Sequence, residues 1–225
     1  GPNKDFAILR HDVEWVPEHS LAAAKIEHEL GLKATYYFHG PHRKRVFKPK
    51  IMHEIAAMGH EIGYHFETLD LCRGDYQAAT KLFVSQLREF RAAGLDVRTV
   101  CAHGNPRVKK IGYKNNNDII SADFNILRQN DLYGEAYLTM PDINYKYISD
   151  VGVRFSNYGS PIDVASLIKS RDATEFYILT HMDYWSPRYP RAFLLDAAAK
   201  AIRASNVNRH VASIRRLRTR ITKAE

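Results

Sequence analysis

The sequence predicts an α/β fold built around a parallel β-sheet. Short runs rich in β-branched and aromatic residues alternate with stretches of helical periodicity, and four such strand–helix repeats fill the first hundred residues. The helical stretches end at glycines, as helices commonly do. Repeats of this kind form a parallel sheet, wound either as a barrel or as an open layer.

The strands and helices of the first half can be placed from their residues. Strands are expected at "FAILRH" (6–11), the aromatic-rich "ATYYFH" (34–39), "EIGYH" (61–65) and "RTVCAH" (98–103). Helices are expected in the Ala- and Leu-rich stretch at 18–31, at 47–59 after Pro49, and at 75–94. In the last of these, Leu82, Phe83, Leu87 and Phe90 recur at helical spacing.

The second half is less regular. A loop is expected around "KNNND" (114–118), with strands near 133–138, 144–149 and 175–181 and a short helix near 163–170. Two further helices are expected, one after Pro190 and a basic amphipathic one at about 207–222. No linker or internal repeat interrupts the chain, so 1–225 is predicted to be a single domain, and 225 residues of which 45% are hydrophobic can bury one sizeable core.

The net charge of +8 is concentrated at the C-terminus. From residue 201 onward seven Lys and Arg stand against one Glu, which leaves 26 basic and 24 acidic residues in the first 200. A smaller basic cluster lies at 42–50 ("HRKRVFKPK"). Such local patches suit an anionic substrate, a membrane surface or a protein partner at least as well as DNA, and no nucleic-acid-binding motif is present. We therefore expect no nucleic-acid partner.

Location is predicted to be cytoplasmic. No apolar run reaches the ~18–20 residues of a membrane span, no segment reads as a secretion signal, and two cysteines are too few for a disulfide framework. The opening Gly1-Pro2 is typical of the remainder of a cleaved tag, which leaves room for a removed native leader.

Histidines and a carboxylate fall where the predicted strands end. His11 and Asp12 end the first strand, and the later strands end at His39, His65, His103 and His181. The carboxyl ends of parallel strands share one edge of a sheet, so Asp12, His65, His103 and His181 should converge. Each histidine alone is more often a core or loop residue. Together they indicate a metal site, because one carboxylate and two imidazoles suit Zn²⁺ or a similar divalent ion.

Several of these segments resemble the motifs of the polysaccharide deacetylases, carbohydrate esterase family 4, which have the NodB-type fold. "GHEIGYH" (59–65) resembles their second motif, "LRHDVE" (9–14) a variant of the first, and "ILTHMDYW" (178–185) the last. "CAHGNP" (101–106) and "YISDVG" (147–152) lie where the third and fourth motifs should be but match loosely. The resemblance spans roughly residues 5–185 and implies a distorted (β/α) barrel of the polysaccharide deacetylase type.

The resemblance implies a metal site, with two departures from the family pattern. It places Asp12 and His65 at metal-binding positions, but His11 stands where the family has the aspartate that acts as general base. Leu69 stands where the family has a second metal-binding histidine. His103 is the preferred replacement ligand, with Glu14 and Glu67 as alternatives.

The implied chemistry is hydrolysis of an amide with the help of a divalent metal ion, for which zinc is the first choice. His181 is the predicted acid that protonates the leaving amine, and Glu14, His11 or Glu67 the predicted base. Asp150 is expected to orient His181, and Arg10 to pair with a carboxylate or a substrate anion. The full set of predicted catalytic, metal-binding and substrate-binding residues is His181, Glu14 and His11; Asp12, His65 and His103; and Arg10, Glu67, Asn105, Asp150 and Trp185.

The predicted function is removal of an N-acyl group, acetyl in the first place, from an amino sugar or an anionic sugar precursor, as in surface-polysaccharide assembly. Two alternatives stay open, a non-catalytic carbohydrate-binding protein on the same scaffold and a hydrolase of a small non-sugar amide. The C-terminal basic helix could dock on an anionic membrane, although a solvated face is the simpler interpretation.

Overall fold

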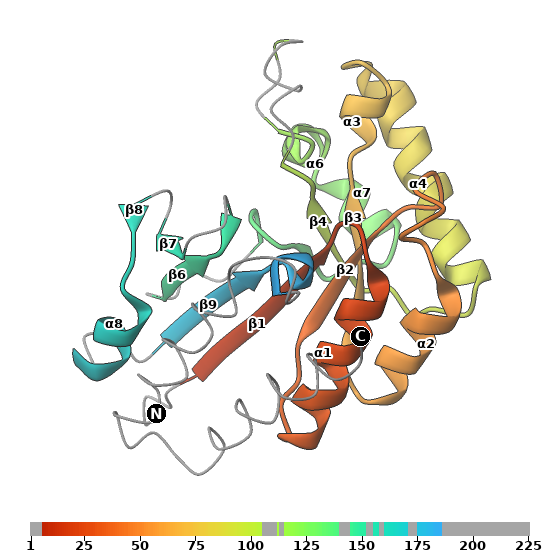
Figure 1. Ribbon diagram of the computed structural model, residues 1–225. Coiled ribbons are helices and arrows are strands. Elements are labelled where there is room, and N and C mark those ends of the chain that lie inside the picture. The colour runs from red at the N-terminus through yellow and green to blue at the C-terminus, as the bar shows by residue number, and fades with distance from the viewer. Residues whose placement is uncertain are drawn as a thin grey trace. The chain divides into compact units, whose positions relative to one another are not determined.

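The computed structural model describes residues 6–104, 112, 115–139, 145–151, 155–157, 160–170 and 175–185 (Figure 1). The chain forms two compact units. The central unit comprises Thr35–Ile143, and the terminal unit combines Gly1–Ala34 with Asn144–Glu225.

The central unit contains a parallel sheet with the strand order β5-β4-β3-β2. Its elements, in chain order, are β2 (Thr35–His39), α2 (Pro49–Ala57), β3 (Glu61–Phe66), α3 (Thr68–Leu71), α4 (Tyr76–Ala92), β4 (Thr99–Ala102), α6 (Asp118–Ala122), α7 (Asn125–Gln129) and β5 (Gly134–Glu135). His39 pairs in register with His65, and His65 with Cys101. The carboxyl ends of β2, β3 and β4 therefore lie at one edge of this sheet.

Aromatic packing between β3 and α4 forms the core of the central unit. Phe83 and Phe90 project from one face of α4 at helical spacing, and their ring centroids lie 5.4 and 5.2 Å from that of Tyr64. Phe66 meets the edge of Phe83 at 5.0 Å. All four side chains are fully buried. Asp75 begins α4 as its N-cap by accepting the backbone N–H of Ala78 at 3.0 Å.

The terminal unit is built from segments far apart in the sequence. Its elements are β1 (Phe6–Val13), α1 (Pro17–Glu29), β6 (Lys146–Ser149), β7 (Ser156–Asn157), β8 (Ser160–Pro161), α8 (Val164–Ser170), β9 (Glu175–Thr180) and the short 3₁₀ helix η2 (Met182–Trp185). The strand order is β1-β9-β6-β7-β8. β1 and β6 both pair with β9 in parallel, with His11 opposite Thr180 and Ser149 opposite Leu179 (Figure 1).

Most of the predicted elements are present, and the differences have local causes. The strand expected at 133–138 is reduced to Gly134–Glu135, because the Glu135 carboxylate accepts the backbone N–H groups of Ala102, Tyr137 and Leu138 and so bends the chain into a turn. α6 begins at Asp118, inside the predicted loop, and α3 and α7 were not expected. The helices predicted after Pro190 and at 207–222 lie outside the described residues.

No helix in the described part of the chain combines sufficient length with sufficient apolar character to cross a bilayer.

Candidate active site

Three histidines of the central unit form what we call the histidine cluster, made of His39, His65 and His103. They follow the ends of β2, β3 and β4, and the ring centroids lie 4.8 Å apart for His39 and His65, 5.0 Å for His39 and His103, and 5.2 Å for His65 and His103. One ring nitrogen of each lies within 4.8 Å of the other two. His39 and His65 are buried, and the His103 side chain is 18% exposed.

Oxygen atoms face the Nδ1 nitrogens of all three rings. His65 Nδ1 donates to the carbonyl oxygen of Cys101 at 3.0 Å, because a carbonyl can only accept. The two carboxylate oxygens of Glu67 lie 3.6 Å from His39 Nδ1 and 3.4 Å from His103 Nδ1. A hydrogen-bond acceptor oxygen therefore lies near the Nδ1 nitrogen of each ring in the histidine cluster.

Glu67 is itself held by the chain that follows β2. Arg43 donates to both carboxylate oxygens at 2.6 and 2.7 Å, and His42 Nε2 donates at 2.6 Å. Gln86 bonds the other ring nitrogen of His42 at 3.0 Å and accepts from the hydroxyl of Tyr64. Burial alone would raise the pKa of Glu67, but the bonds from His42 and Arg43 and the nearby charges hold that pKa well below its usual range. Glu67 is therefore a poorly suited general base.

The residues of the cluster fit a divalent metal ion. Imidazole nitrogens are the ligands that Zn²⁺ and similar borderline ions favour, and three protein ligands leave a coordination position open for substrate or water. Oxygen acceptors behind the ligating rings are the usual partners of metal-bound histidines. A second group, His39, His42 and Glu67, also has ligand atoms within 4.8 Å of one another. The contacts of Glu67 with Arg43 make that group the poorer candidate.

A histidine–carboxylate pair lies at the ends of β6 and β9 in the terminal unit. Asp150 Oδ1 accepts from His181 Nδ1 at 2.6 Å, and Asp150 Oδ2 accepts the His181 backbone N–H at 2.9 Å and the indole N–H of Trp185 at 3.1 Å. Burial lowers the pKa of His181, but the hydrogen bond that His181 donates to Asp150 and the charges of Asp12, Asp150 and Glu14 outweigh it. The net pKa lies above the ordinary value for histidine, and the pairing leaves Nε2 as the nitrogen that can meet a substrate.

The first motif is tied into the terminal unit by buried polar contacts. Arg10 donates to both carboxylate oxygens of Asp12 at 2.9 and 2.7 Å and to the hydroxyl of Tyr177 at 3.2 Å. His11 Nδ1 bonds the hydroxyl of Thr180 at 2.6 Å, and His11 Nε2 donates to Glu27 at 2.8 Å. With both ring nitrogens engaged inside the unit, His11 is better suited to holding β1 in place than to accepting a proton.

Asp183 organises the turn between β1 and α1. Its carboxylate accepts the backbone N–H groups of Glu14, Trp15 and Val16 at 3.2, 3.1 and 2.8 Å. This contact ties the last motif to the first motif and fixes the backbone of Glu14, whose side chain is buried.

The predicted site residues fall into both units. The central unit contains His65, His103 and Glu67, and the terminal unit contains Arg10, His11, Asp12, Glu14, Asp150, His181 and Trp185. Asn105 lies outside the described residues. Sequence reasoning assigned no individual role to His39, His42, Arg43 and Asp183, and treated His42 and Arg43 only as part of the basic segment 42–50. For His39 a signal was present, because it ends a predicted strand as His65 and His103 do.

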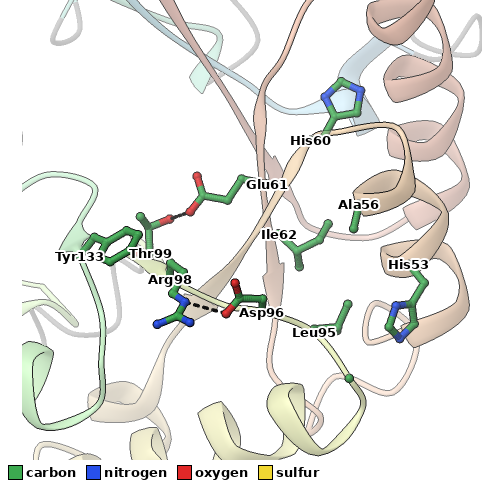
Figure 2. Close-up of a pocket in the computed structure, with 11 residues that line it drawn as sticks. His53, Ala56, His60, Glu61, Ile62, Leu95, Asp96, Arg98, Thr99 and Tyr133 are labelled. Atoms are coloured by element: carbon green, nitrogen blue, oxygen red, sulfur yellow. Dashed lines mark hydrogen bonds and ion pairs between the residues drawn. The ribbon is translucent and has the colours of Figure 1, made fainter.

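A cavity of about 570 Å³ lies at the opposite end of the central sheet (Figure 2). Its wall includes Glu61 and Thr99, the first residues of β3 and β4, together with Arg98 and Tyr133. The Glu61 carboxylate accepts from Thr99 at 2.6 Å, and Arg98 is paired with Asp96. These polar groups satisfy one another, and the cavity is separate from the histidine cluster.

Comparison with known proteins identifies the fold. No family model matches the sequence, and no curated protein matches it. Among solved structures, a CE4 (carbohydrate esterase family 4) pseudoenzyme from Bacillus anthracis is 14% identical with a TM-score of 0.54, covering 92% of this chain and 63% of its own. The catalytic domain of a peptidoglycan N-acetylglucosamine deacetylase from Eubacterium rectale is 13% identical with a TM-score of 0.53, covering 93% and 87%. Peptidoglycan deacetylase PdaC from Bacillus subtilis is 15% identical with a TM-score of 0.51, covering 98% and 86%.

These similarities confirm the predicted fold class. The chain has the α/β fold of the carbohydrate esterase family 4 proteins, as the order of its motifs indicated. It spans 63% of the length of the Bacillus anthracis structure. The fold occurs in deacetylases and in a protein described as a pseudoenzyme, so activity has to be argued from the residues of this chain.

Proposed function

We propose that the protein is a metal-dependent hydrolase that removes an N-acyl group, acetyl in the first place, from an amino sugar. The histidine cluster carries this proposal, because it gathers metal-ligand side chains at the carboxyl edge of a parallel sheet in a fold shared with N-acetylglucosamine deacetylases. His65 and His103 are the proposed ligands in the central unit, and the first motif predicts Asp12 as a carboxylate ligand. A divalent ion bound there would polarise the amide carbonyl and make hydroxide available near pH 7.

His181 is the proposed acid. Its raised pKa keeps the imidazole protonated up to a higher pH than that of an ordinary histidine. The hydrogen bond to Asp150 fixes the orientation of the ring and keeps one proton on Nδ1. The proton on Nε2 can then pass to the nitrogen of the leaving amine as the carbon–nitrogen bond breaks. Trp185, whose indole is held by Asp150, offers an aromatic face of the kind on which sugar rings stack.

Glu14 is the proposed base that takes up the proton of the attacking water. The other two predicted candidates are each held by contacts with neighbouring side chains. Glu67 is held by Arg43 and His42, and His11 by Thr180 and Glu27. The position of Glu14 next to the turn fixed by Asp183 gives its backbone a defined place.

The substrate is proposed to be an N-acetylated sugar or an anionic sugar precursor. The basic segment 42–50 was expected to favour an anion, but two of its residues, His42 and Arg43, are engaged by Glu67. The exposed cations of this segment, which would meet such a substrate, are Lys44, Arg45, Lys48 and Lys50.

A non-catalytic carbohydrate-binding protein is the second candidate. The observations that favour it are Leu69, which stands where a family ligand is expected, and the similarity of the fold to a pseudoenzyme. On this alternative, glycan binding should be insensitive to chelators.

The test measures metal content and amine release together. Purified protein is supplied with zinc, cobalt or nickel and offered N-acetylglucosamine oligomers, and free amine is quantified for wild type, His65→Ala and His181→Ala. We expect metal in wild type and His181→Ala but not in His65→Ala, and amine release only in wild type. His53→Ala is the matched control, because His53 is an exposed histidine of the same unit. Absence of bound metal and of amine release in wild type, with chelator-insensitive glycan binding, would establish the second candidate instead.

A further inference from the structure

We propose that His39 is a metal ligand and completes a three-imidazole set with His65 and His103. This inference rests on the metal dependence of the proposed function and names a ligand that the motifs do not contain. It also explains how the site can work with Leu69 at the position where the family has a second histidine.

The pairing register of β2 and β3 places His39 at the edge of the sheet where we propose that the ion binds. His39 is the last residue of β2 and stands directly opposite His65 of β3, so the two side chains leave the same face of adjacent parallel strands. His103 follows the end of β4, and its backbone N–H donates to the carbonyl oxygen of Phe66 at 2.8 Å, which extends the β3–β4 pairing to the cluster. Each ligand therefore sits on or directly after a strand of one sheet, which is the placement that holds a coordination geometry most firmly.

The oxygens around the cluster select the nitrogens that are available. Cys101 O fixes the proton of His65 on Nδ1, and the two Glu67 oxygens face Nδ1 of His39 and of His103. In each ring a proton on Nδ1 leaves the lone pair on Nε2, on the side away from the acceptor. Three Nε2 lone pairs backed by oxygen acceptors are what a divalent ion of the zinc type requires of its ligands and their outer partners.

The charges of the neighbourhood support the same assignment. Three neutral imidazoles bring no negative charge to the ion, and Glu67 supplies a carboxylate next to two of the three rings. Hydrogen bonds from Arg43 and His42 hold that carboxylate in place. Glu67 is thus a positioning residue for His39 and His103.

A purely structural role for His39 makes a different prediction. A buried histidine that only packs against its neighbours should leave metal affinity unchanged when a polar side chain of similar size replaces it. Outer-shell changes typically reduce metal affinity 10–100-fold, so loss of a ligand should reduce it by more than about 100-fold.

The experiment measures zinc affinity by competition with a chromophoric chelator for wild type, His39→Gln, His39→Asp and the control His53→Gln. We expect one zinc per chain in wild type and His53→Gln, an affinity reduced more than about 100-fold in His39→Gln, and partial recovery in His39→Asp, because aspartate restores a ligand oxygen. Thermal unfolding in EDTA checks that the variants are folded, and cobalt absorption spectra report the change of ligand set directly.

The outcomes separate this inference from the proposed function. Wild-type affinity and an unchanged cobalt spectrum in His39→Gln, with loss of zinc in His65→Ala, would overturn the role of His39 and leave the proposed metal-dependent hydrolase standing. Absence of zinc from wild type would overturn both.

Discussion

Asp150 shows how much one carboxylate contributes at the site of the proposed acid. Its two oxygens accept three N–H groups, two from His181 and one from Trp185, and thereby fix the ring, the backbone and the adjacent indole. Because a carboxylate can only accept, the His181 proton must lie on Nδ1 and the reactive proton on Nε2. Orientation and acidity of the same imidazole therefore depend on one side chain.

Replacement of Asp150 by Asn should move the alkaline limb of the pH profile to lower pH. Burial lowers the pKa of His181, and the hydrogen bond to Asp150 is the largest effect that opposes it, with the charges of Asp12 and Asp150 next, so the pKa should fall when the Asp150 charge is removed. The acid form is lost as pH rises through this pKa, so kcat/KM of Asp150→Asn should decline at lower pH than that of wild type. Asp163→Asn, at an exposed carboxylate of the same unit, should leave the profile unchanged, and an unchanged profile in Asp150→Asn would contradict the assignment of His181.

The same raised pKa affects folding. Protonated His181 is stabilised in the folded state relative to the unfolded chain, so its contribution is complete below the unfolded pKa. That contribution is lost as pH rises through the higher folded pKa.

Part of the candidate site was readable from the sequence because strand ends in parallel sheets converge. This rule predicted that His65 and His103 would meet, and their ring centroids lie 5.2 Å apart; that Asp12 and His181 join them stays a prediction. The rule could not identify Arg43, because this residue follows β2 in a loop without periodicity. The role of Arg43 depends on the carboxylate of Glu67, 24 positions later in the sequence. His39 satisfied the rule but had no counterpart in the motifs, so it received no role.

At the scale of elements, Gly63 explains the glycine within the string "GHEIGYH". A Cβ atom built at Gly63 would lie 2.3 Å from the Tyr37 ring, which crosses β3 at this point. The Tyr37 hydroxyl reaches Thr99 on β4 at 2.9 Å, so one side chain links β2 with β4 across the glycine. The string therefore contains one residue that packing requires and one, His65, that we assign to metal binding.

Replacement of Gly63 by Ala should destabilise the protein by about 1–3 kcal/mol, because the added methyl group overpacks the buried Tyr37 ring. The measurement is the free energy of unfolding from denaturant titration. Gly104→Ala is the control, because no atom lies within 4 Å of a Cβ built there, and its effect should stay within about 0.5 kcal/mol. Equal unfolding free energies for the two variants would show that the Tyr37 ring moves aside without cost.

Elements with strong local patterns were predicted well, and those set by tertiary contacts were not. The periodic apolar face of α4 and the β-rich runs of β1 to β4 and β9 carry their own signals. The end of β5 is determined instead by Glu135, whose carboxylate captures N–H groups from β4 and from its own turn. No local pattern around Glu135 contains that information.

At the scale of the whole molecule, the two parts of the proposed chemistry are built in different compact units. The histidine cluster lies within one continuous stretch, Thr35–Ile143, whereas the pair of Asp150 and His181 lies in a unit that joins both ends of the chain. β1 pairs with β9 more than 160 positions later in the sequence, so the terminal unit cannot form until most of the chain is present.

This division predicts where a bound ion should protect the chain. Zinc that binds only the folded central unit should raise the free energy of opening there, by about 2.7 kcal/mol at a free concentration 100 times Kd, which slows exchange about 100-fold. Hydrogen exchange read by mass spectrometry should therefore slow in β2, β3 and β4 and change little in α8 of the terminal unit. His39→Gln should abolish the difference at the same zinc concentration. Equal slowing in α8 would contradict this expectation and would mean that the ion stabilises both units, whether through a ligand such as Asp12 or because the two units open together.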